Sequence, residues 1–206
     1  NSPFTSSEPV SELAAGEQLF EEMELGGTVN FIAFRQAVAG YNRIKEKSKP
    51  ILTLIDFSKP STEKRFFVFD MEKKKLLYSS VVAHGRNSGE NYATSFSNQY
   101  GSYKSSLGFY LTENTYQGGN GYSLILNGLE KGINDKAKAR SIVVHGAPYA
   151  NPSVAASGRL GRSLGCPALP TKLARPIINT IKDGSVMFIY ANNPHYLAQS
   201  NILHKN

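Results

Sequence analysis

The chain has 206 residues, of which 40% are hydrophobic and 19% are charged, a composition typical of a globular protein with one buried core. Lysine and arginine outnumber aspartate and glutamate by 23 to 16, and the net charge of +7 would attract polyanions. The basic residues are spread along the chain without a nucleic-acid-binding motif, and the longest apolar runs have the length of a strand. We therefore expect neither a nucleic-acid partner nor a membrane-spanning helix, so the protein should not be an integral membrane protein.

The N-terminal part of the chain predicts helices. Residues 1–9 are rich in serine and proline and are expected to be disordered. Residues 10–48 should form a helical extension that packs on the core. Ser11 can cap one helix through about Leu25, and Asn30 can cap a second helix. In that second helix, apolar residues recur every three or four positions, at Phe31, Phe34, Val38 and Tyr41.

From Ile51 onward the pattern changes to short apolar runs of strand length, separated by glycine, asparagine, proline and serine. These runs are Ile51–Phe57, Arg65–Met71, Leu76–His84, Phe109–Thr112, Ser123–Leu126, Ser141–His145 and Val186–Tyr190. A hairpin turn is expected over 70–75, and 171–182 predicts one late helix that Pro176 should kink or restart. We therefore predict a mainly β domain over residues 49–192, followed by a polar C-terminal tail over 193–206.

The single cysteine, Cys166, cannot form an internal disulfide, and its surroundings favour a reactive thiol. A thiol attacks only as the thiolate, so it needs a nearby imidazole, and His145 ends the strand-like run that precedes it. Gly165 allows a tight bend. Because Pro167 has no N–H, the donors of an oxyanion hole must be the amides of residues 164 to 166. The alternative is an inert buried cysteine that acts as a small hydrophobic residue.

The strand-borne His-Gly pair and the later Ser-x-Gly-Cys sequence resemble the catalytic domain of murein L,D-transpeptidases, and one branch of that family closely. The matching segments follow one another between about residues 50 and 190, and they are Val82–Gly89, Phe96–Asn98, Ser105–Tyr110, Gly121–Leu124, Val143–Ala147 and Gly158–Leu169. The resemblance implies an L,D-transpeptidase-like β-sandwich or mixed-sheet domain with N-terminal helices and one late helix. The sequence departs from the commonest pattern at Leu164, where many members carry histidine, and at Pro167 and Ala168, where a polar or basic residue is common.

The resemblance also implies an enzyme that transfers acyl groups on peptidoglycan stem peptides. It implies a thioester on Cys166, no cofactor or metal, and an extracytoplasmic location in the periplasm or cell envelope. His145 would be the catalytic base and Gly165 part of the oxyanion turn. Ser163 could donate a hydrogen bond to the substrate or to the imidazole.

Four further residues are predicted to bind the substrate. Arg162 and Arg86 are cations that can hold a stem carboxylate, and Tyr149 can form a wall of the cleft. His84 also ends a strand-like run before a glycine, and we expect it to line the cleft and to supply the polar group that Leu164 lacks. A salt bridge at Arg162 and a hydrogen-bonded structural role for His84 are the alternatives.

Three other functions stay open at this point. Water in place of an amine could resolve the thioester, which would make the protein an L,D-carboxypeptidase. His84, His145 and Cys166 could be the ligands of a zinc-dependent peptidoglycan hydrolase, because zinc accepts two histidines and a cysteine with an open fourth position. The fold could also serve as a non-catalytic wall-binding module. The absence of a dense metal-ligand motif favours the thiol nucleophile.

Overall fold

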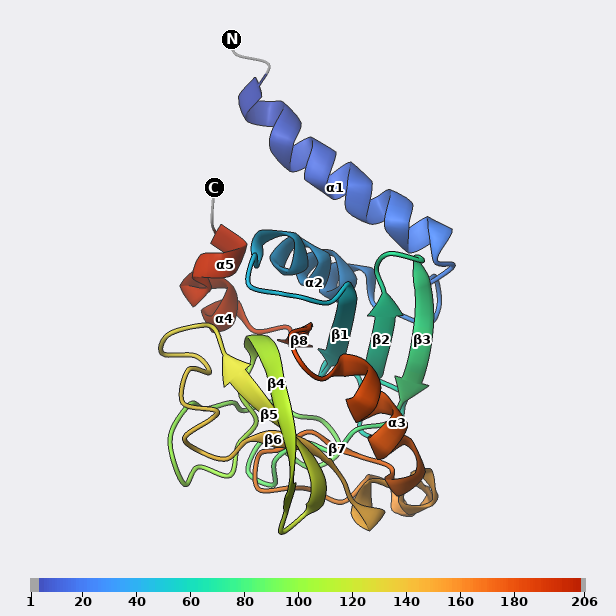
Figure 1. Ribbon diagram of the computed structural model, residues 1–206, viewed down its shortest axis with the longest axis vertical. Helices are drawn as coiled ribbons and strands as arrows, with labels where there is room; N and C mark the ends of the chain where they lie inside the picture. Colours follow the sequence, from blue (N-terminus) through green and yellow to red (C-terminus); the bar gives the residue numbers. More distant parts are fainter. Residues whose placement is uncertain (1–3, 205–206) are drawn as a thin grey trace.

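Eight strands form one mixed sheet in the computed structural model, which describes residues 4–204 (Figure 1). Their order across the sheet is β3-β2-β1-β8-β4-β5-β6-β7. The β1–β8 and β6–β7 pairs are parallel, and the other neighbours are antiparallel. The strands are β1 (Ile51–Asp56), β2 (Phe66–Asp70), β3 (Lys75–Ser80), β4 (Gly108–Gly118), β5 (Gly121–Gly128), β6 (Val143–Gly146), β7 (Ala168–Leu169) and β8 (Val186–Tyr190).

The core lies around the two central strands. Every residue of β1 and β8 is buried, as expected for strands covered on both faces. The helix α2 (Phe31–Arg43) packs against β1 and β8, and α3 (Thr171–Ile181) packs against β6, β5 and β1. The predicted mixed-sheet domain with N-terminal helices and one late helix is therefore confirmed.

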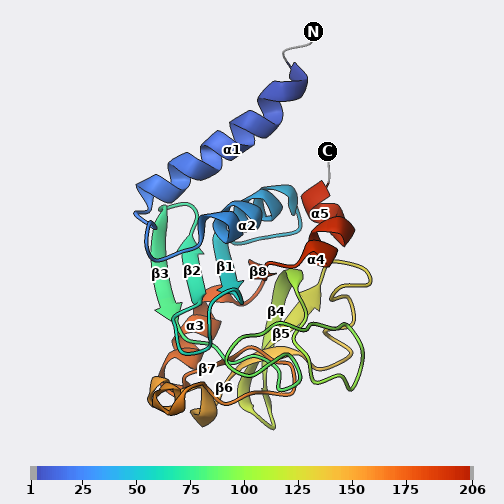
Figure 2. The same cartoon turned by 180° about the vertical axis from the view of Figure 1, so that it is seen from behind.

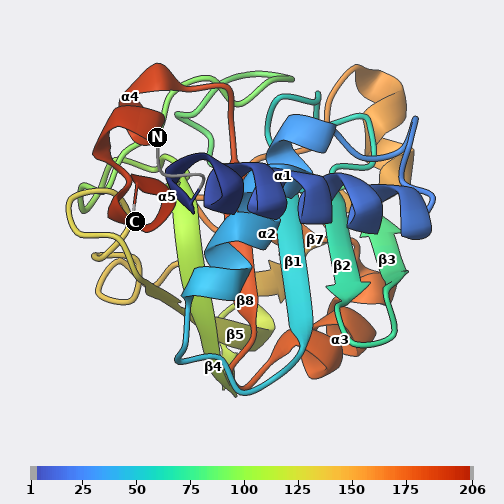
Figure 3. The same ribbon diagram turned by 90° about the horizontal axis from the view of Figure 1, so that it is seen from above.

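The N-terminal helices form a layer on one side of the sheet. Figure 3 shows α1 (Phe4–Glu22) crossing above α2 and the strands β1 to β3. As predicted, Asn30 caps α2, with its side-chain oxygen accepting hydrogen bonds from the amides of Ile32 and Ala33 at 2.9 and 3.3 Å. Phe34, Val38 and Tyr41 of α2 are buried.

The first helix begins earlier than the sequence indicates. We expected disorder over residues 1–9, but α1 already begins at Phe4, and only residues 1–3 of that segment lie outside the described residues. Proline lacks the N–H that an interior helical residue donates, so Pro9, the sixth residue of α1, was a signal against a helix in this segment.

The segment predicted as a polar tail, 193–206, is also helical as far as it is described. It forms α4 (Pro194–Gln199) and α5 (Asn201–His204), which lie beside α2 (Figure 2). Two contacts tie it to the core: the Tyr196 hydroxyl donates to the buried carboxylate of Glu130 at 2.8 Å, and the Ser200 hydroxyl donates to the same carboxylate. Asn193 caps α4 by accepting from the Tyr196 amide at 3.0 Å. The tail is ordered because these polar groups hold it down.

Three further details differ from the expectation. The run Leu76–His84 leaves the sheet after Ser80, and Ala83 then bridges to Ala168 of β7, a two-residue strand too short to predict. The helix α3 continues through Pro176 as one element. The β2–β3 hairpin turns where predicted, with the Asp70 carboxylate accepting from two amides of the turn. No helix among residues 4–204 is long and apolar enough to span a membrane.

Candidate active site

The cysteine lies in a tight turn that only glycine permits. Gly165 has a φ of +125°, in the left-handed region that other residues rarely adopt. A Cβ at this position would lie 2.8 Å from the Cδ1 atom of Ile142 and 3.0 Å from the carbonyl oxygen of Lys104. Both the backbone conformation and the close packing therefore require glycine immediately before Cys166.

Ser163 fixes the shape of this turn from inside. Its hydroxyl donates to the carbonyl of Cys166 at 2.6 Å and accepts from the amide of Gly165 at 3.1 Å. The residue is 4% exposed. The structure thus turns the Ser163 hydroxyl toward the backbone, where we had expected it to meet the substrate or the imidazole.

The turn leaves two amides free to bind an oxyanion. The amide of Gly165 is engaged by Ser163, whereas the amides of Leu164 and Cys166 have no hydrogen-bond partner among the described residues. The Leu164 side chain is 57% exposed and points out of the core. Of the three amides that the sequence offered as donors, the structure therefore leaves two available.

The thiol lies at the beginning of β6. The Val143 amide donates to Sγ of Cys166 at 3.4 Å, and the thiol donates to the carbonyl oxygen of Ser141 at 3.5 Å. Cys166 is 8% exposed, and this burial raises the pKa of its thiol, although the Val143 amide and the charge of Arg140 act in the opposite direction. The resting thiol is therefore protonated at neutral pH.

His145 lies on β6, on the same face of the strand as the side chain of Val143. Alternate residues of a strand share a face, so His145 follows Val143 by about 7 Å along β6. Its Nδ1–H donates to the carbonyl of Gly146 at 3.0 Å, which leaves the lone pair on Nε2. Burial lowers the pKa of His145, so its imidazole is neutral and can accept a proton. Among residues 4–204, no hydrogen bond joins this imidazole to the Cys166 thiol.

His84 does not line the cleft as we had expected. Its ring is 1% exposed, with Nδ1 accepting from the Arg65 guanidinium at 2.8 Å and Nε2–H donating to the carbonyl of Gly89 at 3.1 Å. Burial and the neighbouring Arg65 lower the pKa of His84 to about 4. Arg65 is itself fully buried and also donates to the carbonyls of Val82 and Lys59. His84 is therefore a structural histidine that holds the loop behind the thiol turn.

The two arginines differ in how they are bound. Arg162 donates to the carbonyls of Arg86 and Gly89 at 2.9 and 3.3 Å and forms an ion pair with Glu90 at 3.3 Å. It therefore anchors the loop that follows His84. Arg86 is exposed, and its guanidinium has no partner among the described side chains; its amide donates to the carbonyl of Ser163 at 2.8 Å, which places it beside the turn.

Tyr149 lies within electrostatic reach of the thiol. Burial, followed by the nearby Cys166, raises the pKa of its phenol to about 12. Its ring packs on Gly161, where a Cβ would come within 2.4 Å of the Tyr149 Cβ. That Tyr149 forms a wall of the cleft stays a prediction.

The zinc ligand set is not assembled. Within the described part of the chain, no three His, Cys, Asp or Glu side chains lie close enough together to hold a metal ion. Both ring nitrogens of His84 are occupied by Arg65 and Gly89. The structure therefore does not bring His84, His145 and Cys166 together as the zinc-hydrolase alternative would require.

A cavity that the sequence did not reveal lies beside the beginning of β6, although neither Cys166 nor His145 lines it. Its volume is about 250 Å³, and its lining includes Ser141 and Val143, the two residues that contact Sγ of Cys166. The rest of the lining comes from the β4–β5 hairpin and the segment before β6, namely Tyr116, Ile125, Lys138 and Ile142. Lys138 forms an ion pair with Glu113 at 2.7 Å. In the sequence, the basic residues just before the strand-like run that ends at His145 could have indicated this cavity.

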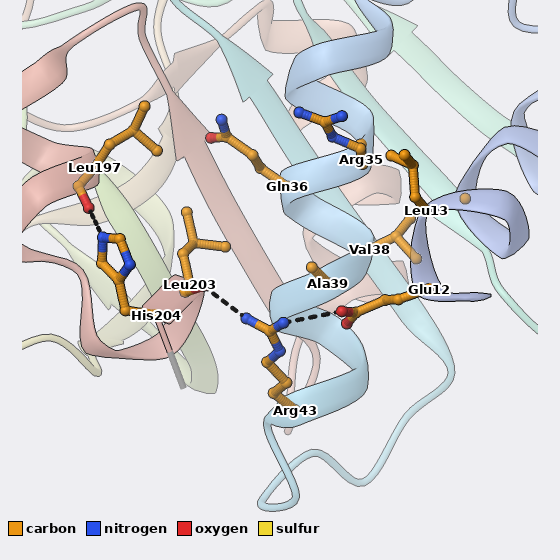
Figure 4. Close-up of a pocket in the computed structure, with 11 residues that line it drawn as sticks. Glu12, Leu13, Arg35, Gln36, Val38, Ala39, Arg43, Leu197, Leu203 and His204 are labelled. Carbon is orange, nitrogen blue, oxygen red and sulfur yellow. Dashed lines mark hydrogen bonds and ion pairs between the residues drawn. The ribbon is translucent and has the colours of Figure 1, made fainter. Parts of the chain in front are cut away.

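A second cavity lies far from the thiol, between α1, α2 and the C-terminal helices (Figure 4). Its volume is about 280 Å³, and neither Cys166 nor His145 lines it. Arg43 crosses it, donating to Glu12 and to the carbonyls of Ile202 and Leu203. This cavity lies where the terminal helices pack, and Arg43 and Glu12, which line it, are paired with each other.

A family model described as the L,D-transpeptidase catalytic domain matches residues 26–190, which is most of the chain. The chain belongs to this family. The match begins before α2 and ends with β8, so it includes the thiol turn and the strand that carries His145. A comparison with curated proteins gives no match.

Solved L,D-transpeptidase structures are similar to this chain at low sequence identity. L,D-transpeptidase 3 from Mycobacterium tuberculosis is 13% identical over 69% of this chain and 61% of its own, with a TM-score of 0.45. An L,D-transpeptidase from Mycobacterium smegmatis is 12% identical over 69% of this chain and 59% of its own, with a TM-score of 0.43. A third, from Stackebrandtia nassauensis, is 14% identical over 89% and 79%, with a TM-score of 0.40. The match thus spans less than two thirds of the two mycobacterial chains.

Proposed function

We propose that the protein is a cysteine-dependent L,D-transpeptidase that transfers acyl groups between peptidoglycan stem peptides. The observation that carries the proposal is the arrangement around Cys166. The thiol belongs to a turn with two unpaired amides, and the strand that it contacts carries an imidazole whose Nε2 is free among the described residues. Membership of the L,D-transpeptidase catalytic domain family supplies the substrate class.

In the first half of the reaction, the thiol proton passes to Nε2 of His145 as Sγ attacks the carbonyl carbon between the L-centre of a diamino acid and the following D-residue. The oxyanion that forms accepts hydrogen bonds from the amides of Leu164 and Cys166. The imidazolium then gives its proton to the leaving amine, D-alanine departs, and a thioester remains on Cys166.

The resting charges require this proton transfer to accompany the attack. Burial raises the pKa of the thiol and lowers that of the imidazole, so the neutral pair is favoured over a thiolate–imidazolium pair. Sγ must also leave its contacts with the Ser141 carbonyl and the Val143 amide to meet Nε2 of His145. Hydrogen bonds of this kind commonly tighten only when the substrate is bound.

The cavity beside Ser141 and Val143 is the proposed place of the donor stem. Its apolar lining would receive the aliphatic part of the peptide, and the ammonium of Lys138 lies at its edge. On the other side of the turn, Tyr149 and the unpaired cation of Arg86 are proposed to contact the rest of the substrate. Stem peptides lie outside the cytoplasm, so the proposal includes an extracytoplasmic location.

Intact-mass measurement tests the nucleophile and the reaction class together. After incubation with a purified tetrapeptide stem, and separately with a carbapenem, the wild-type protein should gain one covalent adduct, and the stem reaction should release D-alanine. The Cys166→Ala variant should remain folded and gain no adduct. Acylation that persists in this variant, or a folded wild-type protein that gains no adduct from either compound, would contradict the proposal and favour a non-catalytic wall-binding module.

The fate of the thioester separates the two outcomes of the same site. With an acceptor amine present, an L,D-transpeptidase yields a cross-linked dimer of stem peptides, whereas an L,D-carboxypeptidase yields only the tripeptide from attack by water. We expect the dimer to dominate at millimolar acceptor concentrations. Chromatography of the products at increasing acceptor concentration would measure the ratio.

A further inference from the structure

Arg140 is a cation held directly behind the thiol turn. It immediately precedes Ser141, whose carbonyl accepts from the thiol, and a Cβ on Gly165 would lie 3.4 Å from its Nη2 atom. The guanidinium donates to four acceptors of the loop 97–106, at 2.8 to 3.0 Å: the carbonyls of Ser97 and Lys104 and the hydroxyls of Ser102 and Ser106. These bonds hold the planar group against the turn and keep it from swinging into solvent.

None of these four acceptors carries a negative charge. Arg140 forms no ion pair within the described part of the chain, whereas Arg43, Arg159 and Arg162 each pair with a glutamate. Burial lowers the pKa of Arg140, and the acidic groups that oppose this shift are the Tyr110 phenol and the Cys166 thiol. The positive charge of Arg140 therefore has no carboxylate to balance it.

We propose that Arg140 is a positioning residue whose fixed positive charge stabilises the thiolate of Cys166, the anion that the guanidinium otherwise lacks. The proposal rests on the proposed role of Cys166 as a nucleophile. The serine hydroxyls and backbone carbonyls of the loop 97–106 keep the charge in place before the reaction begins, so no reorganisation is needed when the thiol ionises. The loop 97–106 thus contributes to the site although none of its residues is a reacting group.

Other titratable groups near the thiol also affect its ionisation. His145 lies two residues beyond Val143 on β6, and Tyr149 faces the thiol from the following loop. Lys104, whose carbonyl accepts from Arg140, directs its ammonium to the hydroxyl of Ser95 at 2.7 Å. The effect of Arg140 must therefore be measured as a difference between variants that keep these groups.

The test is the pH dependence of alkylation of the single thiol by iodoacetamide, followed by intact mass. The Arg140→Met variant should shift the midpoint of the alkylation rate upward by at least about one pH unit, as expected for loss of a unit charge in a partly buried site. Arg140→Lys should recover part of the shift, because it keeps the charge. Lys136→Met removes an exposed cation from the same segment and should leave the midpoint unchanged.

An unchanged midpoint in folded Arg140→Met would overturn the proposal, and so would equal shifts in Arg140→Met and Arg140→Lys. If Arg140→Met does not fold, the variant with both Ser102→Ala and Ser106→Ala removes two of the acceptors and lets the guanidinium move. It should shift the midpoint in the same direction by a smaller amount, and no shift in it would also overturn the proposal. Iodoacetamide needs no peptidoglycan, so these results stand apart from the outcome of the acylation test.

Discussion

The chain contains two His-Gly pairs at the ends of strand-like runs, and the structure gives their rings opposite hydrogen-bonding arrangements. At His84 the buried Arg65 can only donate, so Nδ1 accepts and Nε2 carries the proton. At His145 the Gly146 carbonyl can only accept, so Nδ1 carries the proton and Nε2 keeps its lone pair. The first ring has protein partners on both nitrogens, whereas the second has a partner only on Nδ1 among the described residues. The partner of Nδ1, and not the local sequence, decides which histidine can act as a base.

Among the substitutions considered, those of the two histidines should differ most in their effect on activity. His145→Gln should reduce the rate of acylation by at least about a hundredfold, because general acid–base catalysis contributes on this scale. His84→Gln should change the rate by no more than about threefold, since its ring contacts Arg65 and Gly89 on the far side of the turn. The measurement is the rate of adduct formation with a carbapenem, with thermal melting to verify folding. A larger loss in His84→Gln would reverse the two assignments.

The pH dependence of stability should depend mainly on His84. Its pKa is about 4 in the folded protein and near 6.5 when unfolded, so between these values the unfolded state binds more protons. Stability should therefore fall as the pH decreases from about 6.5 to 4, by about 3 kcal/mol in total, at about 1.4 kcal/mol for each unit of pKa shift.

His84→Gln removes this titration and should flatten the free energy of unfolding over that range. The measurement is denaturant unfolding at several pH values, read as the difference between wild type and variant. His145→Gln measures the contribution of the other buried imidazole, whose pKa burial also lowers. A wild-type slope that survives unchanged in His84→Gln would show that other groups cause it.

The smallest expected effects concern the arginines that flank the turn. Arg86→Ala should raise KM several-fold for stem peptides that carry the terminal carboxylate, because its guanidinium is exposed and unpaired among the described residues. Arg162→Ala should instead lower the free energy of unfolding by about 1 kcal/mol, through loss of its bonds to the loop carbonyls. Kinetics with and without the carboxylate, together with denaturant unfolding of both variants, distinguish the two. If Arg162→Ala raised KM only for stem peptides that carry the carboxylate, Arg162 would instead be a substrate-binding residue.

Local sequence patterns predicted most of the fold because they report local forces. The apolar runs of β1 and β8, the Asn30 cap and the hairpin after Asp70 all depend on residues close in the chain. The order of the C-terminal helices could not be predicted in this way. It depends on Glu130, a carboxylate brought to Tyr196 and Ser200 only by the folded sheet.

The same limit applies to the site. Cys166, His145 and the requirement for Gly165 follow from their immediate neighbours in the sequence and from the resemblance to the family. The partner of His84 could not be predicted, because Arg65 meets it across two segments of the chain that become adjacent only after folding. Arg140 was missed for a related reason: its acceptors are hydroxyls and carbonyls of a distant loop, which carry no charge pattern to recognise.

The protonated state of the resting thiol also affects how fast Cys166 is oxidised. Peroxides oxidise thiolates much faster than thiols, and sulfinic and sulfonic acids at the only cysteine would be permanent losses. Because burial raises the pKa of Cys166, little thiolate is present near neutral pH. Stored protein should accordingly keep its free thiol near neutral pH and lose it faster in alkaline buffers.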